Sequence, residues 1–232
     1  MARIIYIHVP KCGGSSFAPA LRLRYLTSQA SIALNQGDPR LRGTDAILSD
    51  YGARRHELRA HVAAGKRLIS GHVQYDPHLH EGAARNYRFV TMLRDPVDRF
   101  VSHYHYVQRK HPDPGRAATL EGFLDTPDAQ RLASQYLFYF GGHWQGPGIN
   151  IGALTVRAIR HLARFELVGD LSDPDAFLRG LRRLTLTPLV HLRRNVAPVP
   201  LSVPHKLRPR IEALCAADIA IYESRLARRH AA

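Results

Sequence analysis

The chain has few cysteines, and this shortage excludes two common ways of building a small protein. Its 232 residues include two cysteines, Cys12 and Cys215, which lie far apart in the sequence. Neither a disulfide framework nor a zinc knuckle can be built from such a pair. The fourteen histidines do not supply the His-Glu-x-x-His spacing of a zinc-binding helix. We therefore expect no metal site.

Long apolar stretches are also missing. The apolar run from Ile4 to Val9 is too short to cross a bilayer, and the N-terminus lacks the extended apolar core of a signal peptide. These absences predict a cytoplasmic protein with no transmembrane segment.

Acidic residues are scarce relative to basic ones. The sequence has 33 lysines and arginines against 19 aspartates and glutamates, and its net charge is +14. This charge predicts an acidic partner, such as a nucleotide, a polyanion, a nucleic acid or a membrane surface. Part of the excess is arginine spread along expected helices, where it forms a solvated face. Because the charge is dispersed and no RNA- or DNA-binding motif is present, we do not expect a nucleic-acid partner.

Apolar strands alternate with helices along most of the chain. The expected strands are residues 3–9, 67–70, 87–93 and 165–169. The expected helices are residues 14–27, 53–64, 96–109, 119–125, 128–140, 153–163, 173–184 and 206–228. The segment 75–82 reads as a loop. This alternation predicts an α/β protein, a three-layer, P-loop-like fold with a central parallel sheet flanked by helices. A length of 232 residues suits a single domain, residues 1–232.

The most informative stretch follows the first expected strand. Residues 3–9 lead into Pro10-Lys11-Cys12-Gly13-Gly14-Ser15-Ser16, and a helix begins at the glycines. Unpaired N–H groups at a helix start, together with the helix dipole, favour an anion, and Lys11 adds a positive charge. The expected ligand is a phosphate or sulfate group. A Gly-Gly turn with no ligand is the alternative, because short glycine motifs often occur without one.

The position of this lysine excludes two familiar nucleotide-binding patterns. The Walker A loop places its lysine after the glycines, whereas Lys11 precedes Gly13 and Gly14. The Rossmann pattern Gly-x-Gly-x-x-Gly is also absent. The loop therefore does not read as a site for the triphosphate of ATP or GTP.

A second anion site is expected after the strand at 87–93. Arg94 follows this strand at its carboxyl end, where α/β folds bind their ligands, and Ser102 lies two turns into the next helix. An arginine and a hydroxyl placed in this way can hold a second phosphate. A surface ion pair of Arg94 with Asp95 or Asp98 is the alternative.

The two sites together resemble those of one known family. Residues 9–16 resemble the 5′-phosphosulfate loop of the sulfotransferase superfamily, and residues 91–104 resemble its 3′-phosphate motif. The likeness is nearest to carbohydrate sulfotransferases of the heparan sulfate 2-O-sulfotransferase-like group. Ser70-Gly71-His72 resembles the segment that carries the catalytic histidine of this group. His191-Leu192-Arg193-Arg194-Asn195, followed by a terminal helix with Asp218 and Tyr222, resembles its C-terminal cofactor-covering segment.

The resemblance implies an O-sulfotransferase with 3′-phosphoadenosine 5′-phosphosulfate (PAPS) as donor and PAP as product. The acceptor would be a hydroxyl group, expected on a carbohydrate, so the implied partners are a nucleotide donor and a saccharide. The implied donor-binding residues are Lys11, Cys12, Gly13, Gly14, Ser15, Ser16, Arg94, Ser102, Arg193, Arg194 and Asn195. No metal is needed, because lysine, arginine and backbone dipoles supply the positive charge.

Lys11 and His72 are the implied catalytic residues. Lys11 would stabilise the bridging oxygen of the departing 5′-phosphate, and the N–H groups of residues 13–16 would hold its other oxygens. A histidine suits the role of general base because its ordinary pKa is about 6.5. His103 and His105 also lie near the second motif and stay open as alternatives to His72.

The chain departs from the family pattern in two respects. Cys12 stands where the family usually has threonine. The membrane anchor and the disulfides of the family's lumenal members are both missing. The second difference predicts a bacterial-type, cytoplasmic relative.

Two other functions are left open by the residues themselves. A P-loop-like small-molecule kinase would need a lysine after the glycines and a magnesium-binding set, and both are missing in place. A non-enzymatic binder of polyanions or nucleic acid would account for the charge, with tyrosines to stack on bases. Arg193 and Arg194 can also be read as ordinary solvated charges rather than donor contacts.

Overall fold

The computed structural model describes residues 2–33, 43–110, 117, 119–187, 189, 203 and 205–230. Its internal contacts divide the chain into two units. Unit 1 comprises Met1–Val9, Gly13–Met92 and Arg164–Asn195, and unit 2 comprises Pro10–Cys12, Leu93–Ala163 and Val196–Ala232.

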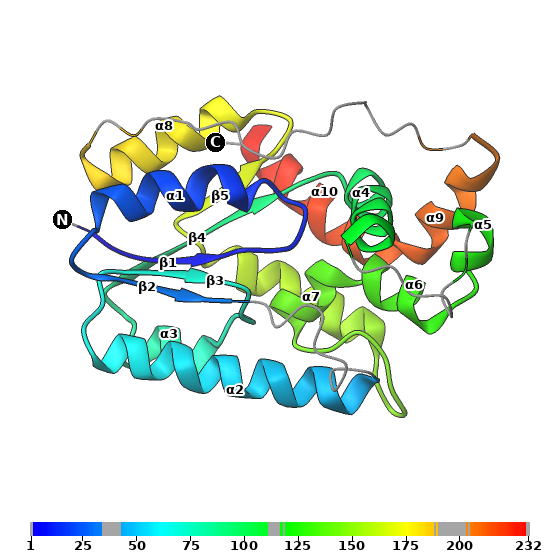
Figure 1. The fold of residues 1–232 in the computed structure, drawn as a ribbon, viewed down its shortest axis with the longest axis horizontal. Coiled ribbons are helices and arrows are strands. Elements are labelled where there is room, and N and C mark those ends of the chain that lie inside the picture. The colour runs from blue at the N-terminus through cyan, green and yellow to red at the C-terminus, as the bar shows by residue number, and fades with distance from the viewer. Residues whose placement is uncertain are drawn as a thin grey trace. The chain divides into compact units, whose positions relative to one another are not determined.

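Unit 1 is built on a five-stranded sheet with the strand order β2-β3-β1-β4-β5 (Figure 1). The strands are β1 (Arg3–Ile7), β2 (Gln29–Ile32), β3 (Leu68–Gly71), β4 (Tyr87–Leu93) and β5 (Leu167–Asp170). β1 pairs in parallel with β3 and β4, and β2 pairs in parallel with β3. The central place of β1 explains its composition, because a strand covered on both faces reads as a continuous apolar run.

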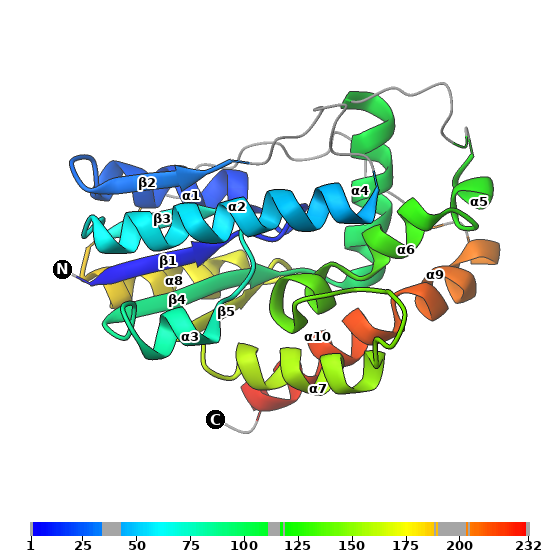
Figure 2. The same cartoon turned by 90° about the horizontal axis from the view of Figure 1, so that it is seen from below.

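Helices cover both faces of this sheet. α1 (Gly14–Arg24) and α8 (Pro174–Thr185) lie on one face, and α2 (Thr44–Ala63) and α3 (Pro77–Glu81) lie on the other (Figure 1). Figure 2 shows the same separation from below. The predicted α/β class, with a central parallel sheet flanked by helices, is therefore confirmed.

The register of the sheet brings the ends of β1 and β3 together. Ile7 is paired with Gly71, and the backbone N–H of His8 donates to the carbonyl of Gly71 at 2.8 Å. A Cβ on Gly71 would lie 2.1 Å from the carbonyl oxygen of Ile32, so a glycine is required where β2 passes β3. The residues that follow these strands, His8 and His72, therefore meet at the carboxyl edge of the sheet.

Unit 2 is built mainly from helices. They are α4 (Pro96–Lys110), α5 (Leu120–Phe123), α6 (Pro127–Ala133), the π-helical η1 (Leu137–Gly141), α7 (Ile151–Leu162), the short 3-10 helix η2 (His205–Leu207), α9 (Arg208–Leu214) and α10 (Ala216–His230). Apolar side chains of α4 pack in one cluster with α5, α6 and α9; the cluster includes Val97, Phe100, Val101, Tyr104, Phe123, Leu132, Ile211 and Cys215. No helix of the described ranges is both long and apolar enough to cross a bilayer.

One local prediction in unit 1 is wrong and one strand was not predicted, each for an identifiable reason. The segment 75–82 contains the short helix α3, which Asp76 caps by accepting a hydrogen bond from the N–H of Leu79 at 3.1 Å. Pro77 occupies the start of this helix, where its missing N–H costs nothing. β2 escapes detection because it pairs on one side only and three of its four residues are partly or fully exposed. It therefore lacks the apolar run of a central strand.

Two helices predicted in unit 2 are each interrupted. The helix expected at 128–140 divides into α6 and η1, and the helix expected at 206–228 divides at Cys215. The carboxylate of Asp218 accepts hydrogen bonds from the N–H groups of Tyr136 and Leu137, both at 2.9 Å. A side chain distant in sequence thus satisfies donors at the first break, and local periodicity does not report this.

Candidate functional site

The loop after β1 has a backbone suited to holding an anion. Lys11 and Gly13 both adopt left-handed conformations, with φ of +68° and +77°. This conformation is uncommon for a residue other than glycine and is frequent at ligand-binding sites. Gly13 supplies no side-chain cap to α1, and the first turn of α1 has no acidic residue. The helix start therefore keeps its partial positive charge, and the side chains of Ser15 and Ser16 lie outside the described part of the chain.

Positive charges gather around Lys11 within unit 2. Burial lowers the pKa of the Lys11 ammonium, and the nearby guanidinium groups of Arg94 and Arg109 lower this pKa further. The Lys11 Nζ lies 4.4 Å from the centre of the Tyr106 ring, a cation–π distance. Three mutually repelling cations favour an anionic ligand among them.

Arg94 forms no ion pair within the part of the chain that the structure describes. Among the described residues no carboxylate pairs with it, so the alternative of a pair with Asp95 or Asp98 is not observed. The Asp95 carboxylate instead accepts from the N–H of Asp98 at 2.9 Å. Ser102, the other residue of the predicted second site, is buried on α4 at 8% exposure.

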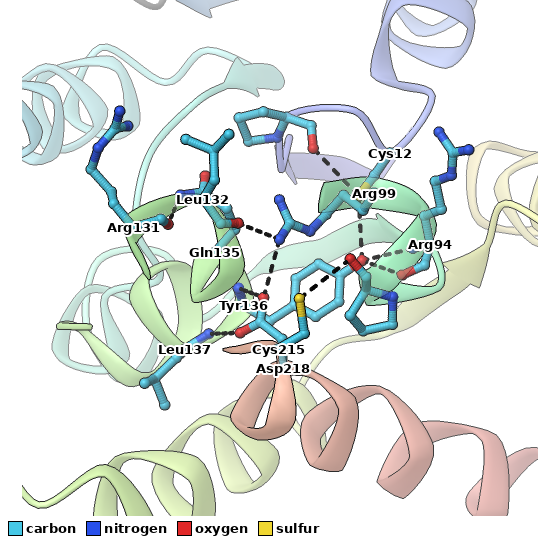
Figure 3. A network of polar contacts seen from close by, with 12 residues as sticks. Cys12, Arg94, Arg99, Arg131, Leu132, Gln135, Tyr136, Leu137, Cys215 and Asp218 are labelled. Carbon is cyan, nitrogen blue, oxygen red and sulfur yellow. Dashed lines mark hydrogen bonds and ion pairs between the residues drawn. The ribbon is translucent and has the colours of Figure 1, made fainter. Parts of the chain in front are cut away.

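The hydroxyl of Tyr136 connects the loop to Arg94 (Figure 3). It accepts a hydrogen bond from the backbone N–H of Arg94 at 2.8 Å and donates one to the carbonyl of the same residue. The Sγ of Cys12 lies 3.5 Å from this hydroxyl and 3.7 Å from the carbonyl oxygen of Pro10. Burial raises the pKa of the Cys12 thiol to about 11, so this buried side chain is uncharged near pH 7. Its backbone alone is left to serve the predicted donor contact.

The buried ion pair of Arg99 and Asp218 contacts Tyr136. Both side chains are fully buried, and the Nη2 of Arg99 lies 3.6 Å from the Oδ2 of Asp218 (Figure 3). Arg99 also donates a hydrogen bond to the carbonyl of Leu132. Burial raises the pKa of Asp218 to about 6, although Arg99 and the N–H groups of Tyr136 and Leu137 act to lower it. Asp218 belongs to the predicted cofactor-covering segment, but its side chain joins the interior of unit 2.

In unit 1, His72 lies against a second histidine, His8, which the sequence motifs did not predict as a site residue. The rings of His8 and His72 are stacked with centroids 4.2 Å apart. Burial, and then the charge of Arg22, lowers the pKa of His8 to about 4, so His8 is neutral near pH 7. A Cβ on Gly14 would lie 1.8 Å from the His8 Nε2, which explains the second glycine of the motif. The sequence holds a signal for His8, because this residue directly follows β1, at the strand end where α/β folds bind ligands.

These histidines face a cavity of about 370 Å³. It lies at the carboxyl ends of β1, β2 and β3. Its lining includes His8, Arg22, Ser31, Ser70, Gly71 and His72. Such a hollow, with a few polar groups converging on it, is the usual form of a small-molecule site.

The alternative histidines have different surroundings. His103 is buried within unit 2, and its Nδ1 has no hydrogen-bond partner among the described residues. Burial, together with Arg99 and Arg131, lowers its pKa well below the ordinary value. His105 is exposed on α4 with its ring 5.1 Å from that of Tyr104. His72, by contrast, is one of the residues that line the cavity of unit 1.

Three of the predicted donor-binding residues are not among those that the structure describes. Arg193, Arg194 and Asn195 lie outside the described residues. Within the described ranges, no group of three or more histidine, cysteine or acidic side chains is placed to hold a metal ion.

The chain is similar in sequence to known proteins. Residues 2–138 match the family model described as the sulfotransferase family. Heparan-sulfate 6-O-sulfotransferase 3 of Mus musculus and that of Homo sapiens are each 32% identical over 91 residues. The match covers 37% of this chain and 18% of the relative. A crystal structure of a sulfotransferase from Alicyclobacillus acidocaldarius covers 97% of this chain and 96% of its own, with a TM-score of 0.49 and 18% identity.

The family match includes the loop after β1, the Gly71-His72 segment and the stretch from Arg94 to Ser102. The matched relatives are named as 6-O-sulfotransferases, whereas the motifs resemble the 2-O group most. The family model matches more than half of the chain, and its description specifies neither of these groups. The chain therefore belongs to the sulfotransferase family.

Proposed function

We propose that the protein is an O-sulfotransferase that takes its sulfuryl group from PAPS. The observation that carries the proposal is the set of cations around Lys11, which no carboxylate among the described residues neutralises. In a chain of the sulfotransferase family, a donor with phosphates at both ends of its ribose fits two adjacent positive sites. We further propose that residues 1–232 act as one sulfotransferase domain, because the family match includes residues of both units.

The donor contacts follow from the charges and the backbone. Lys11 and the N–H groups at the start of α1 bind the 5′-phosphosulfate. Arg94 and Ser102 bind the 3′-phosphate, and so distinguish this donor from ATP. Arg193, Arg194 and Asn195 close over the nucleotide.

The chemistry needs one base and one positive charge. PAPS supplies a sulfuryl group whose bond to the 5′-phosphate oxygen breaks as the acceptor oxygen attacks the sulfur. His72 takes the proton that the acceptor hydroxyl loses, and Lys11 stabilises the negative charge that grows on the departing phosphate. His8 holds the ring of His72 by stacking, and it stays neutral because its pKa is about 4.

The acceptor is proposed to be a carbohydrate hydroxyl. Support comes from the two relatives whose names specify heparan sulfate, of whose length the match covers only 18%.

The donor is tested by thermal denaturation in the presence of nucleotides. We expect PAP to raise the melting temperature by several degrees at saturating concentration, because a ligand that binds only the folded state stabilises it by mass action. If ATP with Mg²⁺ raised the melting temperature more than PAP does, the proposed sulfotransferase activity would be wrong and a kinase would be indicated. The reaction itself is tested by transfer of radiolabelled sulfate from PAPS to a panel of glycans, lipids and small alcohols.

A further inference from the structure

Arg22 lines the cavity beside His72, and no carboxylate among the described residues neutralises its charge. Arg22 lies in the last turn of α1, and its Nη2 is 3.5 Å from the Oγ of Ser70. Its Nε is buried and has no hydrogen-bond partner, and among the described residues no carboxylate pairs with it. A buried donor without an acceptor destabilises a folded protein. Arg22 also lines the cavity, so a ligand that enters there meets its positive charge.

The rest of the lining shows what kind of partner this is. It contains the hydroxyls of Ser31 and Ser70 and the apolar side chains of Ala18 and Ile32, and none of its described residues is an aspartate or glutamate. His8 is uncharged near pH 7, because burial and Arg22 lower its pKa to about 4. A single guanidinium among neutral groups attracts an oxyanion, which it can bind through two parallel hydrogen bonds.

We propose that Arg22 forms an oxyanion subsite for the acceptor, so that the protein selects saccharides with an acidic group close to the reacting hydroxyl. The inference rests on the proposed function, since it takes the cavity at His72 as the acceptor site. The oxyanion is a carboxylate or a sulfate ester, because both present the same oxygens to a guanidinium. Arg22 thus determines specificity and takes no part in the transfer of the proton or the sulfuryl group.

The test uses three probes and three variants. The probes are a glucuronate-containing hexasaccharide, the same glycan with its carboxylates reduced to alcohols, and the reduced glycan carrying sulfate esters. Arg22→Gln removes the charge, and Arg22→Lys keeps it without the fork of donors. Arg24→Gln removes an equal charge from the same helix, at a side chain that bonds Thr187 Oγ1 at 2.8 Å and does not line the cavity.

We expect the wild-type KM to be about tenfold lower for at least one acidic glycan than for the reduced glycan, as the loss of one charged hydrogen bond predicts. Which acidic glycan is preferred distinguishes a carboxylate from a sulfate ester. Arg22→Gln should remove this preference while kcat and the affinity for PAP stay unchanged. Arg22→Lys should keep part of it, and Arg24→Gln should behave like the wild type.

Two results would overturn the proposal. The first is equal KM values for acidic and reduced glycans in the wild type. The second is an Arg22→Gln variant that loses kcat equally with every glycan, which would place Arg22 on the transferring sulfuryl group. If no glycan is sulfated, equilibrium binding of the same probes, with and without PAP, decides by the same criterion. Failure of the proposed function is a separate result, namely a wild-type protein that does not bind PAP.

Discussion

Lys11 and His72 carry the proposed chemistry through different physical effects, so their removal should have different signatures. Lys11→Ala should reduce sulfuryl transfer by about 10²- to 10³-fold, because it removes a charge that stabilises the leaving phosphate. His72→Ala should reduce it by about 10²- to 10⁴-fold, the usual loss for a general base. The measurement is kcat with the best acceptor of the panel, with circular dichroism as the check on folding.

The affinity for PAP separates the two variants. PAP should bind more weakly to Lys11→Ala and unchanged to His72→Ala. A fully active His72→Ala variant would exclude this histidine as the base. His103→Ala and His105→Ala would then be the next variants to measure.

His8 makes a specific prediction for acid stability. Its pKa is about 4 in the folded protein against an ordinary value of 6.5. Between these values the unfolded chain binds a proton that the folded chain does not, so stability is lost as the pH falls from 6.5 to 4. The full loss from this residue would be about 3 kcal/mol.

The His8→Gln variant cannot take up this proton. Its free energy of unfolding, measured by urea titration, should therefore fall less steeply over that pH range. His56→Gln, at an exposed histidine of α2, is the matched control and should keep the wild-type slope. Equal slopes in wild type and His8→Gln would show that His8 is protonated alike in the folded and unfolded chain.

Cys12 shows how a residue that departs from a motif can be explained by its packing. The resemblance counts Cys12 among the donor-binding residues, although the family usually has threonine at this position. Its thiol lies within the core of unit 2 against the Tyr136 hydroxyl, 124 residues away in the chain. A thiol with a pKa of about 11 is neither a nucleophile nor a metal ligand near pH 7.

At the scale of elements, Asp218 joins α10 to the segment between α6 and η1. It accepts the N–H groups of Tyr136 and Leu137 and pairs with Arg99 on α4. Asp218→Asn would leave the Arg99 guanidinium buried without a counter-charge and could present an amide donor to two N–H donors. We expect a loss of about 3–5 kcal/mol in the free energy of unfolding.

Asp128→Asn provides the control for this change. Asp128 forms an ion pair with Arg131 at 2.8 Å, but its side chain is 51% exposed. Such a surface pair contributes about 0–1 kcal/mol. If urea unfolding gave equal losses for the two variants, the buried pair would not be what holds these elements together.

The elements also differ in how far local sequence predicts them. β4 was predicted with its observed bounds, because a mostly apolar and buried strand is followed by a capping aspartate, Asp95, and by the proline that starts α4. β2 was not predicted, since a short edge strand has no apolar periodicity to detect. The break between α6 and η1 depends on Asp218, about 80 residues further along the chain, so no local pattern contains it.

At the scale of the whole molecule, the net charge of +14 has a local meaning that composition does not give. Arginines such as Arg88 and Arg210 are paired with acidic residues on the surface. Lys11, Arg94 and Arg22 have no carboxylate partner among the described residues. Part of the positive charge that is not paired with described carboxylates therefore lies at the two candidate sites.

The sequence by itself determined the fold class, the loop with its lysine ahead of the glycines, and the arginine after β4. These features depend on apolar runs, glycines and caps that act over a few residues, so they can be read without a fold. The tertiary structure alone decided that His8 stacks on His72, that Arg22 enters their cavity, and that Tyr136 joins Cys12 to Arg94. Each of these contacts joins segments distant in sequence, and only the packing of strands and helices brings such segments together.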